Sequence, residues 1–407
     1  MKAFESATLP NGLRIICEQS PTDTVYCGLH VSAGTRHEDA LDTGLAHFCE
    51  HTSFKGTERR RSHHIRSRLD IVGGDVNAYT NKEETVYYAA VAREHFERAA
   101  DLLFDMVFHS VYPQTELDKE VQVIVDEIDS YNDSPAELIY DEFEEMLFCG
   151  SGLGRNILGN EKRLREFRTE DALRFTRKYY VPSNVTFFVY GRVPFKRVLQ
   201  LAERFTVGLL PGEKAPQKEL MPTYKPERRV QEHSTHQAHV LIGNRGYSFA
   251  HPDKTALFLL NNMIGGPGMN SLLNVSLREQ RGLVYTVEST AFSYMDAGMW
   301  SVYYGCDEAD VNRCRRIVLN TLRKLTSDSL TETALRNAKR QLIGQIRIAS
   351  DNFESYALAL GKTFARTGKH RDVDEICERI MALSAQDVLR VGQDIFQEEK
   401  LSMLVYQ

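Results

Sequence analysis

Alternation of apolar and polar residues predicts several β-strands in the first half of the chain. Residues 24–34 and 184–190 are rich in β-branched and aromatic side chains and are bounded by turn-forming residues. Residues 8–18 begin with a Pro-Asn-Gly turn and continue into a further apolar run. Residues 73–91 carry β-forming residues on both sides of a polar turn, and this pattern predicts a β-hairpin.

Helical periodicity occupies the stretches between these strands. Apolar residues recur every three or four positions at 94–110, 115–130, 135–148 and about 170–179. Strand-rich and helix-rich stretches then recur in the same order in the second half of the chain. The pattern predicts the α+β class, with mostly antiparallel sheets that each carry helices on one face.

Matches between the two halves indicate an internal duplication. Residues 171–190 align without a gap with residues 387–406 at an offset of 216 residues, and both segments end in an apolar strand. Residues 211–226 contain four prolines among polar side chains, which is typical of a linker. We therefore expect an N-terminal domain at 1–210 and a homologous C-terminal domain at 227–407.

Composition and charge exclude several classes of protein. The chain has 407 residues, of which 42% are hydrophobic and 26% charged, as in a globular protein of two domains. Its net charge of −6 disfavours nucleic-acid binding, and no apolar run approaches the roughly 18–20 residues of a membrane span. The N-terminus has no signal or transit pattern, and the seven cysteines are scattered without a C-x-x-C pair. We expect a soluble, cytoplasmic protein without nucleic-acid or membrane partners.

His47, Glu50 and His51 form an H-x-x-E-H pattern, the inverse of the metal-binding H-E-x-x-H motif. On a helix, residues i, i+3 and i+4 share one face, with neighbouring Cβ atoms roughly 5–6 Å apart. The two histidines can therefore present imidazole nitrogens to one metal ion, and the glutamate can act on a metal-bound water. Apolar neighbours favour a helix here, and Asp42 or Thr43 is expected to cap its N-terminus.

A catalytic zinc site needs a third protein ligand and one open position. Without that ligand, the pattern fits two ordinary histidines one turn apart beside an acid. The helix expected at 115–130 offers two candidates, because Glu120 and Glu127 lie two turns apart on one face. One carboxylate can complete the site while the other orients a ligand histidine. The same spacing also fits a solvated acidic face.

The second half of the chain lacks these side chains. At the register of the duplication, the three motif positions fall on Leu259, Asn262 and Met263, and the two acidic positions fall on Ala338 and Gln345. These residues cannot hold zinc. The acidic pair therefore occurs only in the half that also carries the histidines, as a shared site requires.

The chain resembles the pitrilysin/insulinase family of metallopeptidases, nearest the two-domain type that includes mitochondrial processing peptidase subunits. Residues 44–51 (GLAHFCEH) match the family's metal-binding helix, and the resemblance covers nearly the whole chain. It implies one zinc ion per chain, held by His47, His51 and Glu127. It also implies that Glu120 is an auxiliary acid.

Two further segments carry this resemblance. Residues 73–80 match a segment whose edge strand accepts substrate backbone, which implies that Asn77 and Ala78 bind an extended peptide. Arg278 and Tyr285 match a pair that reaches the metal site and donates hydrogen bonds to the substrate carbonyl. In the family, two such two-domain units face each other around a closed chamber. We therefore expect a homodimer, with a heterodimer containing a related subunit as the alternative.

These features predict a zinc-dependent metalloendopeptidase that cleaves unfolded peptides, in which Glu50 acts first as general base and then as general acid. The competing hypothesis is a non-catalytic structural or substrate-binding subunit. Lineages of that kind lose ligand residues, whereas all the residues named above are present in this chain. A zinc hydrolase with other substrates is disfavoured, because Asn77 and Ala78 suit an extended backbone.

Overall fold

The computed structural model describes residues 4–216, 218–233 and 235–407. The chain divides into two compact units, each assembled from three separate segments. The first unit comprises the chain up to Asp129, Arg155–Pro216 and Ala349–Arg371, and the second comprises Ser130–Gly154, Gln217–Ile348 and Asp372–Gln407. These units differ from the contiguous domains expected at 1–210 and 227–407. Each unit contains a helical segment that belongs, by sequence, to the other half.

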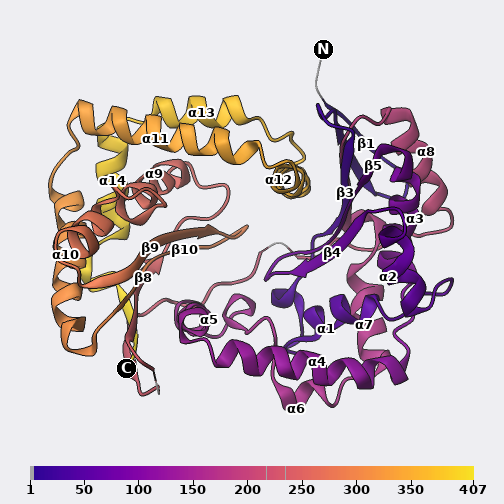
Figure 1. The fold of residues 1–407 in the computed structure, drawn as a ribbon, viewed down its shortest axis with the longest axis horizontal. Coiled ribbons are helices and arrows are strands. Elements are labelled where there is room, and N and C mark those ends of the chain that lie inside the picture. The colour runs from indigo at the N-terminus through magenta and orange to yellow at the C-terminus, as the bar shows by residue number, and fades with distance from the viewer. Residues whose placement is uncertain (1–3, 217, 234) are drawn as a thin grey trace. The chain divides into compact units, whose positions relative to one another are not determined.

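The first unit contains a six-stranded sheet with the strand order β1-β2-β6-β3-β5-β4 (Figure 1). Its strands are β1 (Phe4–Thr8), β2 (Arg14–Glu18), β3 (Thr24–Val31), β4 (Asp75–Thr80), β5 (Thr85–Ala92) and β6 (Val185–Tyr190). All neighbouring strands are antiparallel except β2 and β6, which are parallel. Strand β4 lies at one edge of this sheet.

One face of this sheet carries the main helical layer, as the sequence pattern predicts. In the inner strands β2, β3, β5 and β6, alternate residues point to this layer and are fully buried, for example Ile15, Leu29 and Phe187. The helices of the first half that belong to this unit are α1 (Leu45–Ser53), α2 (Ser62–Asp70), α3 (Phe96–His109), α4 (Gln114–Asn132), α6 (Glu161–Leu164), α7 (Thr169–Tyr179) and α8 (Phe195–Phe205).

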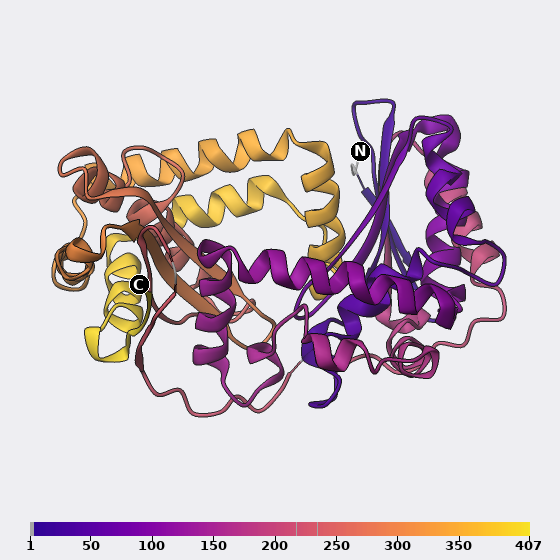
Figure 2. The ribbon, with the colours of Figure 1, turned by 60° about the horizontal axis from the view of Figure 1, so that its bottom comes forward.

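The opposite face of the same sheet is also covered, by the single helix α12 (Phe353–Thr367), as Figures 1 and 2 show. The intervening strand residues are apolar too, and Ile16, Phe188 and Tyr190 form a second core with this helix. A Cβ on Gly361 would lie 2.4 Å from the Phe188 ring, so the glycine lets the helix approach the sheet closely. The expectation of helices on one face therefore describes the main layer but omits this helix.

The second unit repeats this design around a five-stranded sheet with the order β7-β11-β8-β10-β9. Its strands are β7 (Arg228–Gln231), β8 (Ala238–Arg245), β9 (Val284–Ser293), β10 (Gly298–Cys306) and β11 (Ser402–Tyr406). Its helices are α5 (Pro135–Phe148), α9 (Lys254–Gly265), α10 (Val311–Ser327), α11 (Glu332–Ser350), α13 (Val373–Ala382) and α14 (Ala385–Ile395). Only β7 and β11 pair in parallel.

The two sheets confirm the internal duplication. Strands β2, β6, β3, β5 and β4 correspond in order to β7, β11, β8, β10 and β9. Helices α4 and α5 are followed 218 residues later by α11 and α12. The corresponding helices α5 and α12 are exchanged, because α5 packs on β8 and β11 while α12 packs on β3 and β6. This exchange explains why the compact units are discontinuous in sequence.

None of the helices in the described parts of the chain has the length and apolar character needed to cross a membrane.

Candidate metal centre

The N-terminus of helix α1 is held by a side chain that the sequence did not suggest. Gly44 occupies the N-cap position with φ of 93° and provides no side-chain cap. Instead, the buried carboxylate of Glu38 accepts hydrogen bonds from the backbone N–H groups of Gly44, at 3.0 Å, and Ala46, at 2.7 Å. Burial raises the pKa of Glu38 to about 8, although these two hydrogen bonds act in the opposite direction. The glutamate therefore fixes the first turn of α1, two residues before His47.

Asp42, one of the two residues expected to cap α1, makes other contacts. Asp42 receives hydrogen bonds from Arg163 and Arg174 at 2.6 and 2.7 Å, so its carboxylate faces α6 and α7 instead of capping α1. Because the N-cap residue is Gly44, the helix has no N-cap side chain that could accept a hydrogen bond from its first turn. Position 44 requires glycine for two reasons: its backbone is left-handed, and a Cβ there would lie 2.8 Å from the backbone of Gly159.

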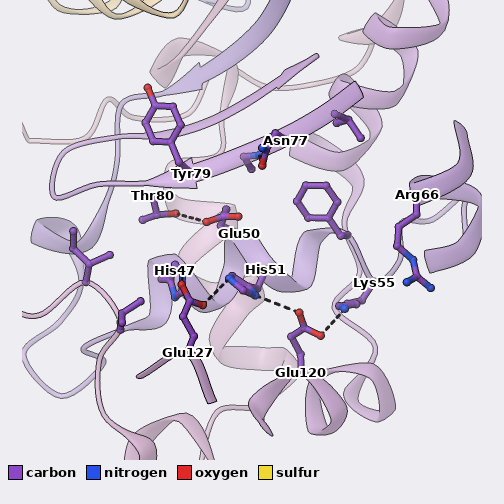
Figure 3. A pocket seen from close by; sticks show the side chains of 15 residues that line it. His47, Glu50, His51, Lys55, Arg66, Asn77, Tyr79, Thr80, Glu120 and Glu127 are labelled. Carbon is purple, nitrogen blue, oxygen red and sulfur yellow. Dashed lines mark hydrogen bonds and ion pairs between the residues drawn. The ribbon is translucent and has the colours of Figure 1, made fainter. Parts of the chain in front are cut away.

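His47, His51 and Glu127 converge at one point, where each offers a ligand atom and these atoms all lie within 4.8 Å of one another. Glu127 Oε1 lies 3.9 Å from His47 Nε2, and Glu127 Oε2 lies 3.4 Å from His51 Nε2. Helix α1 provides the two imidazoles from consecutive turns, and helix α4 provides the carboxylate (Figure 3). This is the only cluster of this kind among the described residues.

The cluster fits a tetrahedral metal ion. Ligands about 2.0–2.1 Å from zinc lie roughly 3.3 Å apart, close to the separations found here, so small side-chain movements would complete the coordination. His47 is 6% exposed, and its Nδ1 has no hydrogen-bond partner among the described residues. Two imidazoles and a carboxylate are also the ligand set of many catalytic zinc sites, in which a fourth position stays open.

Glu120 takes the place expected of the auxiliary acid. Its Oε1 lies 3.3 Å from His51 Nδ1, the ring nitrogen that faces away from Glu127. Its Oε2 lies 2.5 Å from the ammonium group of Lys55, one helical turn after His51. A carboxylate on the outer ring nitrogen fixes the orientation and tautomer of a ligand histidine. Glu120 therefore orients a ligand and does not itself join the cluster.

The charges in the cluster favour a cation. Burial lowers the pKa of His47 to about 4, and the nearby His51 adds to this effect. Burial also disfavours the charged form of His51, but the carboxylates of Glu120 and Glu127 outweigh it and raise the pKa of His51 to about 10. At neutral pH His47 is therefore neutral, and His51 carries an extra proton and a positive charge between the two acids. A metal ion at this point would replace that proton with a larger positive charge.

Glu50 lies on the same face of α1 and does not belong to the cluster. It is 8% exposed, and its Oε2 accepts a hydrogen bond of 3.3 Å from the hydroxyl of Thr80 in β4. Burial raises the pKa of Glu50 to about 7, although His51 and the Thr80 hydrogen bond act in the opposite direction. A carboxyl group with a pKa near neutrality can both accept and donate a proton under physiological conditions.

Asn77 and Ala78 lie in the edge strand β4 and line the same pocket. The Ala78 N–H donates to the side-chain Oδ1 of Asn77 at 2.8 Å, so this N–H faces away from β5. It is therefore a backbone donor at an open strand edge, which an extended peptide could use instead of the asparagine side chain.

Arg278 and Tyr285 belong to the second unit. Arg278 lies in a π-helical turn at Asn274–Glu279, and Tyr285 lies in β9 with 85% of its surface exposed. The exposure leaves both side chains available for contact, and their action at a metal site stays a prediction.

Four side chains near the centre escaped the sequence analysis. Lys55 follows His51 by four residues, and this spacing alone would have placed it on the same helix face. Thr80 and Glu38 approach α1 through tertiary packing, which no local pattern encodes. Arg66, on helix α2, also lines the pocket beside the cluster.

The fold and the cluster together define a duplicated α+β protein with one candidate metal centre. The family model of insulinase (peptidase family M16) matches residues 14–161, and a model described as the peptidase M16 inactive domain matches residues 166–342. The whole candidate metal centre lies in the first match, in agreement with the absence of ligand residues from the equivalent positions of the second half.

Relatives of known sequence or structure extend over nearly the entire chain. "Uncharacterized zinc protease YmxG" of Bacillus subtilis (strain 168) is 33% identical over 98% of this chain and 97% of its own length. Mitochondrial-processing peptidase subunit beta of Saccharomyces cerevisiae is 27% identical over 98% of this chain and 90% of its own length. The crystal structure of a protease from Helicobacter pylori has a TM-score of 0.90 at 21% identity and covers 99% of both chains, which supports the fold. The chain belongs to the insulinase family, peptidase family M16, and the resemblance noted in its motifs is confirmed.

Proposed function

We propose that this protein is a zinc-dependent endopeptidase that cleaves unfolded peptides. The convergence of His47 Nε2, His51 Nε2 and Glu127 on one small volume carries the proposal. Relatives named as zinc proteases support both the metal and the reaction class. Zinc, when bound, polarises a carbonyl group and lowers the pKa of water.

Glu50 is the proton carrier of the proposed reaction. Its carboxylate accepts a proton from the attacking water and returns it to the leaving nitrogen of the cleaved peptide bond. The hydrogen bond from Thr80 orients this carboxylate and links it to the strand on which the substrate lies. Burial of Glu50 excludes bulk water that would compete for the proton.

The substrate binds as an additional strand at the edge of the first sheet. The Ala78 N–H pairs with a carbonyl of the peptide, and the Asn77 side chain releases that N–H as the peptide enters. Main-chain pairing requires an extended substrate, so a folded protein is a poor substrate while an unfolded peptide is a good one.

The proposed assembly is a homodimer in which Arg278 and Tyr285 donate hydrogen bonds to the substrate carbonyl at the second subunit's metal site. The exposure of Tyr285 supports this role, and the name of the yeast relative, a subunit, supports assembly in general. The molecular mass in solution tests this point. A species of twice 46.4 kDa agrees with a homodimer, and a monomer that is active only with a related chain indicates a heterodimer.

Cleavage of a quenched fluorescent peptide tests the proposal. We expect turnover by the wild type, loss of turnover with a chelator, recovery with zinc, and inactivity of Glu50→Gln with zinc still bound. The competing function, a non-catalytic substrate-binding subunit, predicts peptide binding without turnover by either protein. Equal turnover by the wild type and by Glu50→Gln would refute the role of Glu50.

A further inference from the structure

The pocket beside the metal centre continues past the catalytic residues to a second charged group. It has a volume of about 550 Å³ and is lined at one part by His47, His51 and Glu127 and at another by Arg66. Figure 3 shows the arginine beyond Lys55 and Asn77, away from the cluster. The guanidinium group therefore lies in the same pocket but outside the candidate metal centre.

Among the described residues, Arg66 forms no ion pair, unlike most of the other cations of its segment. Lys55 is paired with Glu120, and three neighbouring arginines form ion pairs with acids of α3; they are Arg59, Arg60 and Arg68, paired with Asp101 or Asp105. No carboxylate of the described residues forms an ion pair with Arg66, whose side chain is exposed. The pocket therefore contains an unpaired guanidinium group that faces incoming ligands.

Arg66 lies on a helix that is anchored in the core, and some of its neighbours in the pocket are apolar. It lies on α2 between Ile65 and Leu69, both of which are completely buried and anchor the helix to the core. Phe54 and Val76 are partly buried and line the same pocket. Apolar neighbours lower the local dielectric constant, and this strengthens an ion pair with a ligand relative to one in water.

The direction of β4 determines which part of a substrate meets this arginine. The strand runs from Asp75 to Thr80, and the Thr80 end contacts Glu50. A peptide that pairs antiparallel with β4, the more stable arrangement, runs in the opposite direction. Its segment after the cleaved bond therefore extends towards Val76 and Arg66. At about 3.3 Å per residue, the arginine is roughly two to four residues beyond the cut.

We propose that Arg66 forms a carboxylate-binding subsite for the part of the peptide that follows the cleaved bond. A guanidinium group binds carboxylates with two parallel hydrogen bonds. The carboxylate comes either from an aspartate or glutamate side chain or from the C-terminus of a short peptide. This subsite rests on the proposed peptidase function and defines a class of preferred substrate for it.

The test uses three otherwise identical quenched fluorescent peptides. The first carries glutamine at the second to fourth positions after the cut, the second carries glutamate there, and both have amidated ends. The third carries glutamine but ends in a free carboxylate at the fourth position. We expect the wild type to cleave one or both acidic peptides with a kcat/KM about 10-fold above that of the neutral peptide, mainly through KM. The better of the two acidic peptides identifies the source of the carboxylate.

Variants assign this preference to the guanidinium group. Arg66→Gln should remove the preference, and Arg66→Glu should reverse it, so that the neutral peptide is cleaved faster than the acidic ones. Arg61→Gln is the matched control, because Arg61 is exposed at the start of the same helix and does not line the pocket. It should keep the full preference. Equal cleavage of acidic and neutral peptides by the wild type, or a preference that persists in Arg66→Gln, would overturn the subsite.

Binding measurements separate failure of the subsite from failure of the peptidase proposal. Fluorescence anisotropy with labelled peptides is measured on Glu50→Gln and on the same protein with Arg66→Gln. Arg66-dependent affinity for acidic peptides without cleavage by any form would refute the peptidase function and retain the subsite. Cleavage without any Arg66-dependent difference in affinity or rate would refute the subsite and retain the peptidase function.

Discussion

Helices α1 and α9 occupy equivalent positions in the two units, each following a long central strand, yet they present different side chains. Where α1 carries His47, the equivalent residue in α9 is Leu259, which is fully buried in an apolar core. The fold therefore does not need a polar group at this position. Burying a histidine instead of a leucine costs stability unless its nitrogens are satisfied. Packing of the fold therefore does not account for the polar side chains of α1, which agrees with the proposed metal centre.

The exchanged helices give a second comparison. In the second unit, α5 covers its sheet with apolar and aromatic side chains such as Phe143 and Leu147. In the first unit, α12 adds buried charges, because Lys362 and Arg366 form ion pairs with Glu84. Helix α5 adds hydrogen bonds that join Tyr140 to Glu288 and Tyr294 to Glu144, whereas α12 adds ion pairs with a buried acid.

Replacing the ligands of α1 with the residues of α9 should have the largest effect. In the double variant His47→Leu and His51→Met, loss of the metal removes several kcal/mol of charge stabilisation, so we expect peptide cleavage to fall by at least about 10³-fold. The thermal unfolding temperature of the variant without metal should equal or exceed that of the wild type without metal. Retention of cleavage would show that His47 and His51 are not needed for metal binding and activity.

Replacing Glu50 separates proton transfer from metal binding. Glu50→Gln should lower kcat by about 10²- to 10⁴-fold, because general acid–base catalysis contributes on that order. Bound zinc and KM should change little, since this side chain is outside the cluster. Elemental analysis beside steady-state kinetics checks both points. Loss of the metal together with activity would instead make Glu50 a ligand or a structural residue.

Acid should weaken the packing of α12 more than that of α5. Burial disfavours the charged form of Glu84, but His30, Lys362 and Arg366 outweigh burial and hold its pKa well below the usual 4.5. The unfolded chain therefore binds this proton at a higher pH than the folded chain. The stabilisation is fully present above about pH 4.5 and is lost as the pH falls below that value.

Glu84→Gln tests this pH dependence. Breaking a buried ion pair costs about 3 kcal/mol, so the variant should unfold at a lower urea concentration at pH 7 and lose part of the acid dependence. Hydrogen exchange resolved by helix should show faster opening of α12 and unchanged protection of α5. Equal effects on both helices would refute the comparison.

Replacing Glu120 with alanine, the residue at the equivalent position of α11, should have a smaller effect on the metal centre. The carboxylate orients His51 without joining the cluster, so zinc affinity should fall by about 10- to 100-fold. Lys55→Met is the matched control, because Lys55 contacts Glu120 but not the histidine, and it should reduce affinity less. Competition with a fluorescent chelator measures both. An unchanged zinc affinity in Glu120→Ala would show that Glu120 does not orient His51 for metal binding.

Local patterns in the sequence predicted most of the elements of the first half. The helix expected at 135–148 has those bounds in the structure, and the hairpin at 73–91 appears as β4 and β5. Hydrophobic periodicity encodes these elements directly. It does not encode which sheet a helix joins, because an apolar helix face fits either core. The exchange of α5 and α12 therefore could not be predicted from the sequence alone.

The candidate metal centre was predictable to the extent that its residues follow helical spacing. His47 and His51 are one turn apart, and the acidic helix offered two glutamates; only the family resemblance distinguished Glu127 from Glu120. Contacts made through tertiary packing were missed. Glu38 lies in a loop and caps α1 through two backbone hydrogen bonds, an arrangement without a periodic signal.

The number of zinc ions per chain, measured by elemental analysis, tests the central claim most directly. It compares the wild type with Glu127→Gln, which introduces the residue found at the equivalent position of α11, and with the reciprocal Gln345→Glu. We predict one zinc ion for the wild type, none for Glu127→Gln, and one for Gln345→Glu, whose helix faces no histidine pair. Zinc retained in Glu127→Gln, or absent from the wild type after reconstitution, would contradict the claim that these three side chains form a metal centre.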